Sequence, residues 1–365
     1  MSLDQGAMSI STTQFVILGV SAFALTGLLT WPVRSLAIRL GAMDAPNLAR
    51  KTQAEPVPYM GGIAIALGIM IITLAAVFVG GNSDGENNSQ LKDLALTVLF
   101  PALVLGAMGL FDDLRSLSPW PRLITQTLVG TIVAFAIIEN GTMGTPFGTS
   151  GTGDTGSWIN TAITVFWIVG ICNSINFFDN LDGAASGAVA IAALGVFIIA
   201  FDRGQELVSA LSIVTTGATI GFLMWNKSPA KIYMGDAGAL FLGVIISVVT
   251  IRLNPGITPV WQSIAIPVML LAIPLLDTSV AVFSRLARGL SPLTGGKDHL
   301  SHRLVRAGLT RPMAAISLWS ASGVCALFAL GVYFFADSLG SVLIGVFVSV
   351  WLMALALFLR TPSQD

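Results

Sequence analysis

One polar stretch of the chain carries four amide and carboxylate side chains at intervals of three residues: Asn173, Asn176, Asp179 and Asp182. If the helix that precedes them continues, this spacing places all four near one face. Amide and carboxylate oxygens suit a hard divalent cation, or the hydroxyl groups of a sugar nucleotide. A polar cap on an apolar helix is the plainer interpretation, and the further clusters described below weigh against it.

Two more carboxylate clusters border apolar runs. Asp112 and Asp113 are adjacent, and like charges side by side raise the pKa of one carboxyl group. That suits a general base or a cation held between the two groups, and a solvated helix end is the alternative. Asp236 lies in a Gly-Asp-x-Gly sequence ahead of an apolar run, where it is either a ligand or a helix N-cap. Tyr233, three residues earlier, would stack on a nucleobase or lie at a membrane interface.

Both histidines of the chain, His299 and His302, lie in one loop with Arg303. Two histidines three residues apart are half of a zinc site, but no third ligand completes it, so the loop predicts a phosphate grip. A basic helix at the membrane interface is the alternative. Arg50 and Lys51, in an earlier loop, are also placed to meet phosphate, or reflect only the charge bias of membrane loops.

Two further features lie beside apolar runs. Gly61 and Gly62 precede one such run, where glycine lets the backbone approach closely and a helix N-terminus favours an anion. Asp277 lies near the end of another. Its carboxylate either pairs with Arg285 or Arg288 for structural reasons or serves the site, and the sequence favours neither.

The elements that must position these residues are membrane helices. Of 365 residues, 54% are hydrophobic and 10% are charged, against roughly 25% charged in soluble domains. Mean hydropathy is +0.83, and Cys172 and Cys325, in apolar stretches, predict neither a disulfide nor a metal site. We expect an all-α polytopic membrane protein. At roughly 17–25 residues per span, the eleven predicted spans are 14–33, 60–80, 93–111, 123–139, 158–175, 184–201, 207–225, 237–253, 261–283, 313–335 and 339–359.

The distribution of basic residues predicts the orientation. If the loops after the odd-numbered spans are cytoplasmic, that side holds fifteen of the eighteen Lys and Arg, and the other side holds Lys92, Arg203 and Arg252. The positive-inside rule then predicts the N-terminus outside and the C-terminus inside, with every polar cluster on the cytoplasmic side. We expect a polar extension over 1–13, one integral-membrane domain over 14–360 and a tail over 361–365.

Taken together, the clusters resemble the polyprenyl-phosphate N-acetylhexosamine-1-phosphate transferases, a membrane family that includes the phospho-MurNAc-pentapeptide translocases. The resemblance covers nearly the whole chain and rests on five motifs in order, each weak alone. They are Pro58-Tyr-Met-Gly61-Gly62, Gly109-Leu-Phe-Asp112-Asp113, Asn173-x-x-Asn176-x-x-Asp179-x-x-Asp182-Gly183, Met234-Gly235-Asp236-x-Gly238 and His299-Leu-Ser301-His302-Arg303-Leu.

The resemblance implies transfer of a sugar-1-phosphate from a UDP-sugar to undecaprenyl phosphate, releasing UMP, with Mg²⁺ as cofactor and Mn²⁺ as its alternative. It implies that Asp236 is the main Mg²⁺ ligand, that Asp113 supports the metal or the acceptor, and that Asp112 deprotonates or positions the lipid phosphate. The implied substrate-binding residues are Asn173, Asn176, Asp179 and Asp182 on the nucleotide side, Tyr233 against the uracil, and His299, His302 and Arg303 on the pyrophosphate, with Arg50 and Lys51 nearby.

The last motif is closest to the UDP-GlcNAc-type enzymes of the family, because the pentapeptide translocases carry three consecutive histidines there. It departs from that type at Ser301, where a histidine is usual, so the exact sugar stays open. We expect the initiating step of cell-envelope glycan synthesis at the cytoplasmic face of a bacterial plasma membrane. No nucleic-acid partner is expected, and a homodimer stays open. The alternative from another class is an ion-coupled transporter, whose carboxylates would lie near the bilayer midplane in two related halves.

Overall fold

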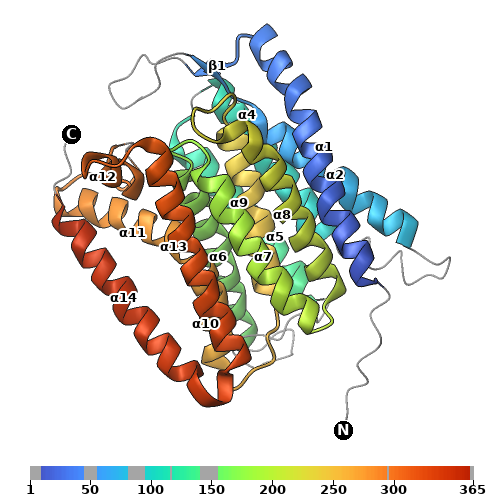
Figure 1. Cartoon of the computed structure of the whole chain (residues 1–365), viewed down its shortest axis with the longest axis vertical. Helices are drawn as coiled ribbons and strands as arrows, with labels where there is room; N and C mark the ends of the chain where they lie inside the picture. Colours follow the sequence, from blue (N-terminus) through green and yellow to red (C-terminus); the bar gives the residue numbers. More distant parts are fainter. Residues whose placement is uncertain are drawn as a thin grey trace.

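The computed structural model describes residues 10–44, 56–80, 95–115, 117–139, 155–293 and 296–361. Within them the chain is a bundle of long helices (Figure 1), with one two-stranded antiparallel pairing of β1 (Met43–Asp44) with β2 (Val57–Pro58). The helices are α1 (Thr12–Arg39), α2 (Gly61–Gly80), α4 (Phe100–Arg115), α5 (Pro119–Glu139), α6 (Thr155–Phe178), α7 (Ala184–Asp202), α8 (Glu206–Asn226), α9 (Gly235–Arg252), α10 (Val260–Leu270), α11 (Ala272–Ala287), α12 (Leu300–Arg306), α13 (Arg311–Phe334) and α14 (Ser341–Arg360), with short π-helical turns at Ala95–Leu99 and Ala336–Gly340.

The core of the bundle is α9. Its most apolar window is 83% buried, whereas that of the terminal helix α14 is only 6% buried. Helices α2, α4 and α6 pack on α9, and α1 and α7 pack on α8. Because α9 is surrounded by protein, the residues at its first turn are held by neighbours on several sides, and that turn carries Asp236.

The predicted apolar segments are all helical in the described residues. Eight of these helices are long and apolar enough to cross a membrane, and the bent pair α10 and α11 would make nine. Helices α2 and α5 occupy two further predicted segments; the apolar stretch of α2, Gly61–Val77, is shorter than the eight. An all-α, multi-pass membrane protein is therefore the architecture that the structure supports.

The segment predicted as one span over 261–283 is two helices, α10 and α11, bent by 74° at their junction. Pro267 lies inside α10, and Pro274 lies in the first turn of α11. A proline lacks the N–H that would donate to the carbonyl four residues earlier, and its ring crowds that carbonyl. The bend redirects α11, which carries Asp277, toward the end of the bundle that carries α12.

The expectation that one helix face carries all four residues from Asn173 to Asp182 is wrong beyond Phe178, where α6 ends. The Asn180 side chain donates to the Phe177 carbonyl at 2.6 Å, which satisfies a terminal carbonyl of the helix. Gly183 then takes a left-handed conformation (φ 73°) at the start of α7. Asp179 and Asp182 therefore lie in a turn rather than on the helix.

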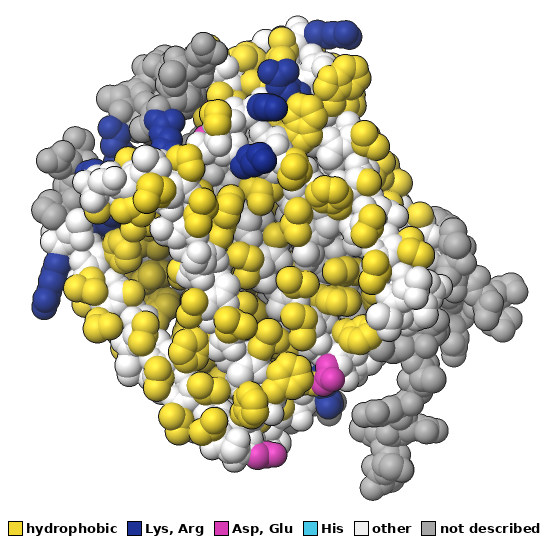
Figure 2. Space-filling model, viewed as in Figure 1, with side chains coloured by type: hydrophobic (Ala, Val, Ile, Leu, Met, Phe, Trp, Pro, Cys, Tyr) yellow, Lys and Arg dark blue, Asp and Glu magenta, His cyan; other side chains and the backbone are white. Residues whose placement is uncertain are grey.

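The surface of the bundle is divided into bands. Figure 2 shows a broad apolar band between an upper end, around which most of the Lys and Arg of this view gather, and a lower end with exposed acidic side chains and a basic one. In Figure 1, α12 and β1 lie at the end of the bundle opposite the start of α1, and the end of α14 lies near α12. The turn after α6 contacts α12 through Asn180 and Ser301, and α6 contacts the N-terminal end of α9 through Asn176 and Asp236.

Close backbone approach between α2 and α9 requires glycine. A Cβ atom on Gly62 would lie 2.2 Å from the Gly238 nitrogen, and we expect Gly62→Ala to force apart helices that the buried site needs. Overpacking costs about 1–3 kcal/mol, so the thermal unfolding midpoint of the purified protein should fall. Gly323→Ala is the matched control, because a Cβ there meets nothing within 4 Å. Equal midpoints for the two variants would contradict this packing.

Candidate active site

Two carboxylates from different helices share one guanidinium group. Asp112, near the end of α4, and Asp236, in the first turn of α9, both contact Nη1 of Arg122 from the first turn of α5, at 2.8 and 2.7 Å. Asp112 is 7% exposed and Asp236 is 28% exposed, so the pair is partly removed from water. Like charges this close need a cation between them, and the Arg122 side chain supplies it.

The other oxygen of each carboxylate is also bonded. Asp236 Oδ1 accepts a hydrogen bond from Asn176 Nδ2 at 2.7 Å, and Asp112 Oδ1 accepts one from the Leu117 backbone N–H at 2.6 Å. Both carboxylates are therefore fixed in orientation by groups from α5, α6 and the loop after α4. A fixed pair of charged oxygens is preorganised for a cation or for the proton of an attacking group.

Asp113 supports the same cluster from behind. Its two carboxylate oxygens accept hydrogen bonds from the backbone N–H groups of Asp236 and Ala237 at 2.9 and 3.1 Å. These are orphan donors of the first turn of α9, and an acidic group there is favourable. A Cβ on Gly235, which has φ 70°, would lie 2.5 Å from Asp113 Oδ2. Asp113 thus caps α9 and positions Asp236.

The two glycines of the first motif hold two loops together. Gly61 N–H donates to the Tyr233 carbonyl and Gly62 N–H donates to the Met234 carbonyl, each at 2.9 Å. Tyr233 N–H donates back to the Pro58 carbonyl. The predicted close approach is confirmed. Because both amide N–H groups already donate to carbonyl oxygens, they are not available to bind an anion in this arrangement. Arg50 and Lys51 lie outside the described residues.

The remaining predicted residues around α6 differ in what they contact. Asn173 donates to Gln126 Oε1 at 2.6 Å and to the Val169 carbonyl, so its amide serves the packing of α5 on α6. Asp182 accepts a hydrogen bond from the Ala230 N–H at 3.1 Å, which ties its turn to the loop before α9.

Asp179 lies in a strongly acidic environment. Burial, followed by the charges of Asp236, Asp113 and Asp182, raises the pKa of Asp179 to about 8. Burial also raises the pKa of the Tyr233 hydroxyl, and the charge of Asp182 raises it further. The neighbouring carboxylates thus add to burial in opposing a negative charge on Asp179, and a bound cation would relieve that opposition.

The loop with both histidines is anchored by a buried carboxylate. Asp277 Oδ2 contacts His299 Nδ1 at 2.7 Å, and Asp277 Oδ1 accepts from the Leu300 N–H at 2.6 Å. Pairing of Asp277 with Arg285 or Arg288, one of the two expectations, is not what the structure contains. Those arginines bind Asp298 instead, at 3.1 and 2.5 Å.

Arg303 and His302, assigned to the pyrophosphate together with His299, differ in burial and in hydrogen bonding. Arg303 is 1% exposed and its guanidinium is bonded to Ser284 Oγ and to the carbonyls of Asp298, Phe358 and Thr361, so the structure does not bring it to the carboxylate cluster. His302 is half-buried, and burial lowers its pKa to about 4, so it is a neutral hydrogen-bonding group at pH 7.

Two contacts join the histidine loop to the end of α6. Ser301 Oγ in α12 donates to Asn180 Oδ1. The Arg285 guanidinium lies 5.6 Å from the centre of the Phe177 ring, and the His299 ring lies 5.9 Å from it. All the described clusters thus form one connected region. Sequence reasoning did not assign Arg122 or Asn180 a role; for Arg122 the only signal was a basic residue close after two adjacent carboxylates.

Known proteins resemble this chain over most of its length. Residues 95–254 match glycosyl transferase family 4. The chain is 34% identical over 297 residues, 81% of this chain and 78% of the relative, to a "Probable undecaprenyl-phosphate N-acetylglucosaminyl 1-phosphate transferase" of Bacillus subtilis. It is 28% identical over 392 residues (100% and 93%) to a "Decaprenyl-phosphate N-acetylglucosaminephosphotransferase" of Mycolicibacterium smegmatis. A "Phospho-N-acetylmuramoyl-pentapeptide-transferase" of Streptococcus thermophilus is 31% identical over 262 residues (66% and 73%).

Removing the shared cation should destabilise the cluster. In Arg122→Gln, Asp112 and Asp236 keep their charges without the guanidinium between them, and we expect a loss of about 1–3 kcal/mol of folding free energy in metal-free buffer. The midpoint of thermal unfolding reports it. Arg115→Gln is the control, because Arg115 is exposed at the end of α4, the helix that carries Asp112. An unchanged midpoint for Arg122→Gln would contradict the shared-cation geometry.

The raised pKa of Asp179 predicts a pH dependence of stability. Between about pH 4 and pH 8 the folded state keeps a proton that the unfolded state loses, so stability should fall as pH rises through that window. Asp179→Asn cannot ionise and should flatten this part of the profile. Unfolding midpoints of both proteins across the window, in metal-free buffer, test the sign. A wild-type profile that rises relative to that of the variant would refute it.

Proposed function

The chain belongs to glycosyl transferase family 4, and from that premise we propose that it transfers N-acetylglucosamine-1-phosphate from UDP-N-acetylglucosamine to undecaprenyl phosphate, releasing UMP. The proposal rests on the carboxylate cluster, in which Asp112 and Asp236 share Arg122 and Asn176 binds Asp236, with each of the four residues on a different helix. A loop that only joined membrane helices would not need charged groups fixed in this way.

The chemistry asks mainly for charge neutralisation and alignment. Transfer of a phosphoryl group from a diphosphate proceeds with little covalent help from protein groups. We assign Asp112 to accept the proton of the acceptor phosphate or to orient it, since its carboxylate is fixed by Leu117 and Arg122. Asp113 orients Asp236 through the first turn of α9.

The nucleotide side of the site is assigned to the turn after α6 and the loop before α9. Asp179 and Asp182 lie in that turn, and Asp182 is bonded to the backbone of Ala230 in the facing loop. Tyr233 lies in the same facing loop, half-buried, and offers an aromatic face to a uracil. His302, neutral at pH 7, would donate or accept a hydrogen bond at the diphosphate rather than pair with it as a cation.

The donor set fits Mg²⁺ as a cofactor. The oxygens of Asp236 and Asp112 are hard ligands already oriented around one cationic group. Burial raises the pKa of Asp179, and the charges of Asp236, Asp113 and Asp182 raise it further, so a cation beside these carboxylates would be favourable. No group of three or more His, Cys, Asp or Glu in the described residues forms a complete metal site. Substrate phosphates would supply the remaining ligands. When bound, Mg²⁺ would neutralise charge on the diphosphate, with Mn²⁺ as its substitute.

The proposed membrane arrangement rests on the distribution of Lys and Arg between the loops that join the helices. We propose eleven crossings, the N-terminus outside and the C-terminus inside, in a bacterial plasma membrane. Fifteen of the eighteen Lys and Arg then lie on the cytoplasmic side with the carboxylate cluster. A polyprenyl acceptor explains why a water-soluble nucleotide sugar is used at a membrane face, since the lipid tail stays in the bilayer.

The choice of N-acetylglucosamine rests on the relatives. Those named for it align with 81% and 100% of this chain, whereas the relative named for the pentapeptide substrate aligns with 66%. The product, a polyprenyl diphosphate sugar, suits the first step of a cell-envelope glycan. Nothing in the cluster favours a transporter, because its carboxylates lie at helix ends rather than inside the spans of two related halves.

Replacing Asp236 by Asn should abolish transfer while the protein still folds. Asn keeps the shape and the hydrogen-bonding reach of the side chain but removes the charge that a divalent cation and Arg122 require. Transfer of labelled N-acetylglucosamine-1-phosphate into the lipid phase, measured at saturating Mg²⁺, should fall by at least about 100-fold. Asp337→Asn, an exposed change in the turn before α14, is the matched control. Near-normal transfer by Asp236→Asn would rule out the metal role.

A further inference from the structure

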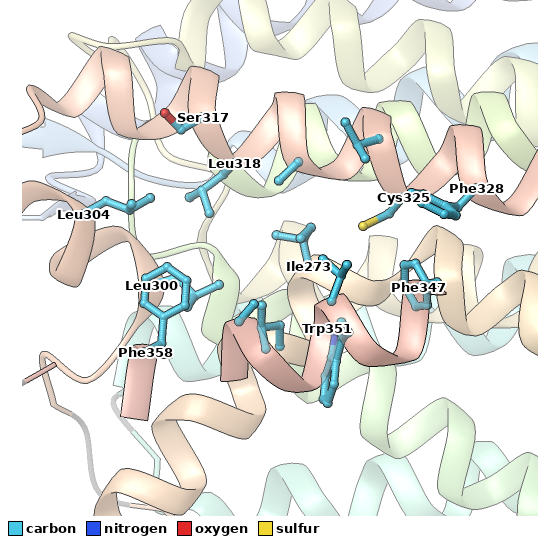
Figure 3. A pocket seen from close by; sticks show the side chains of 15 residues that line it. Ile273, Leu300, Leu304, Ser317, Leu318, Cys325, Phe328, Phe347, Trp351 and Phe358 are labelled. Atoms are coloured by element: carbon cyan, nitrogen blue, oxygen red, sulfur yellow. The ribbon is translucent and has the colours of Figure 1, made fainter. Parts of the chain in front are cut away.

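Helix α12 is short, and apolar packing alone does not fix it. It has seven residues, Leu300–Arg306. Leu300 and Leu304, on its inner side, line an apolar cavity of about 320 Å³ between α11, α13 and α14. Figure 3 shows these two side chains at one end of the cavity, close to Phe358 of α14. A helix with a void behind it gains fewer contacts there than a close-packed one, so polar contacts must determine where it lies.

Those polar contacts converge on the first turn of α12. The Asp277 carboxylate is 0% exposed and uses one oxygen for the Leu300 N–H and the other for His299 Nδ1. Ser301 adds a hydrogen bond to Asn180 in the turn after α6. At the far side, Arg303 joins α12 to α11 and to the end of α14. Asp277 is the only one of these groups that contacts both the backbone and the histidine of the motif.

The partners of His299 fix its tautomer. Arg285 Nη2 lies 3.3 Å from His299 Nε2, and a guanidinium can only donate, so Nε2 must be the accepting nitrogen. The proton is then on Nδ1 and is donated to Asp277 Oδ2. Arg285 cannot withdraw easily, because it is 2% exposed and also bonded to Asp298 and to the Pro292 carbonyl. Both ring nitrogens of His299 are therefore used inside the protein.

We propose that Asp277 is a positioning residue, which locks His299 as the Nδ1–H tautomer and thereby holds α12 so that His302 reaches the donor diphosphate. His302 follows His299 by three residues, and the two ring centres lie 6.2 Å apart, so the locked ring and the free ring are neighbours on one side of the helix. The role of His302 rests on the proposed function, whereas the tautomer and the anchoring of α12 do not.

An aspartate is the residue type that this arrangement demands. In Asp277→Asn the amide oxygen would still accept from Leu300, but an NH₂ group would face His299 Nδ1 while Arg285 faces Nε2. A neutral imidazole has one accepting nitrogen, so one of the two donors must lose its partner. A nearly isosteric substitution therefore breaks the lock without removing volume from the core.

The chain contains two histidines, which makes the lock directly observable. In full-length protein labelled with isotopic nitrogen at histidine, held in lipid nanodiscs, we expect one ring to give the signals of a neutral Nδ1–H tautomer. The variant His302→Gln assigns that ring to His299. In Asp277→Asn the His299 signals should shift to the other tautomer or to an exchanging mixture. A wild-type His299 with the proton on Nε2, or identical spectra for the two proteins, would overturn the proposal even if transfer activity were never detected.

Kinetics separates positioning from loss of folded enzyme. Asp277→Asn should raise the KM for UDP-N-acetylglucosamine by on the order of 10- to 100-fold, with a smaller effect on the KM for undecaprenyl phosphate. His302→Ala should raise the same KM, and the two changes combined should cost less than the product of their separate effects. Asp337→Asn is again the control. A drop in kcat with both KM values unchanged, or fully multiplicative effects, would show that Asp277 does not act through His302.

Discussion

The site depends on one interaction, the contact of a single guanidinium nitrogen of Arg122 with Asp112 and Asp236. The two carboxylates belong to helices α4 and α9, which would repel each other at this end without a cation between them. Their separation is in turn fixed by backbone contact, since a Cβ on Gly109 would lie 2.3 Å from the Asp236 carbonyl oxygen. Close packing of α4 on α9 brings the two carboxylates together, and the positive charge of Arg122 offsets their repulsion.

The same principle extends outward from the pair. Asp113 satisfies the first amides of α9, and Asp277 satisfies the first amide of α12 while it holds His299. In each case a carboxylate from another helix accepts hydrogen bonds at a helix start and positions a polar residue there, Asp236 in α9 and His299 before α12. The cluster therefore contains carboxylates that bind Arg122 and carboxylates that bind the backbone at a helix start, and the adjacent residues Asp112 and Asp113 provide one of each kind.

Much of this arrangement follows from the sequence because its causes are local. Apolar runs predict the helices, Gly61 and Gly62 predict a close approach, and Asp236 before an apolar run predicts a helix start. The bend between α10 and α11 was signalled by Pro267 and Pro274, but hydropathy alone reads that segment as one span. The end of α6 was mispredicted because spacing was extended through Asn180, whose side chain closes the helix.

Partnerships between distant segments could not be predicted. From the sequence alone, any of several basic residues is a candidate partner for each acidic residue. Only the fold selects Arg122 for Asp112 and Asp236, and His299 for Asp277. It likewise selects the carbonyls of Phe358 and Thr361 for Arg303. Burial decides these choices, since a charge removed from water must be paired where the chain places it. The type of a residue thus indicates which reactions or ligands it suits. The partner that fixes its charge and orientation belongs to a distant segment and is known only from the fold.

We propose that this cluster moves a sugar phosphate between a nucleotide and a membrane lipid. Release of UMP by the purified protein, with Mg²⁺ and a panel of UDP-sugars, tests it most directly. We expect UMP from UDP-N-acetylglucosamine only when undecaprenyl phosphate is present, and in an amount equal to that of the lipid-linked product. Release that ignores the lipid, or none from any UDP-sugar by folded protein, would contradict it.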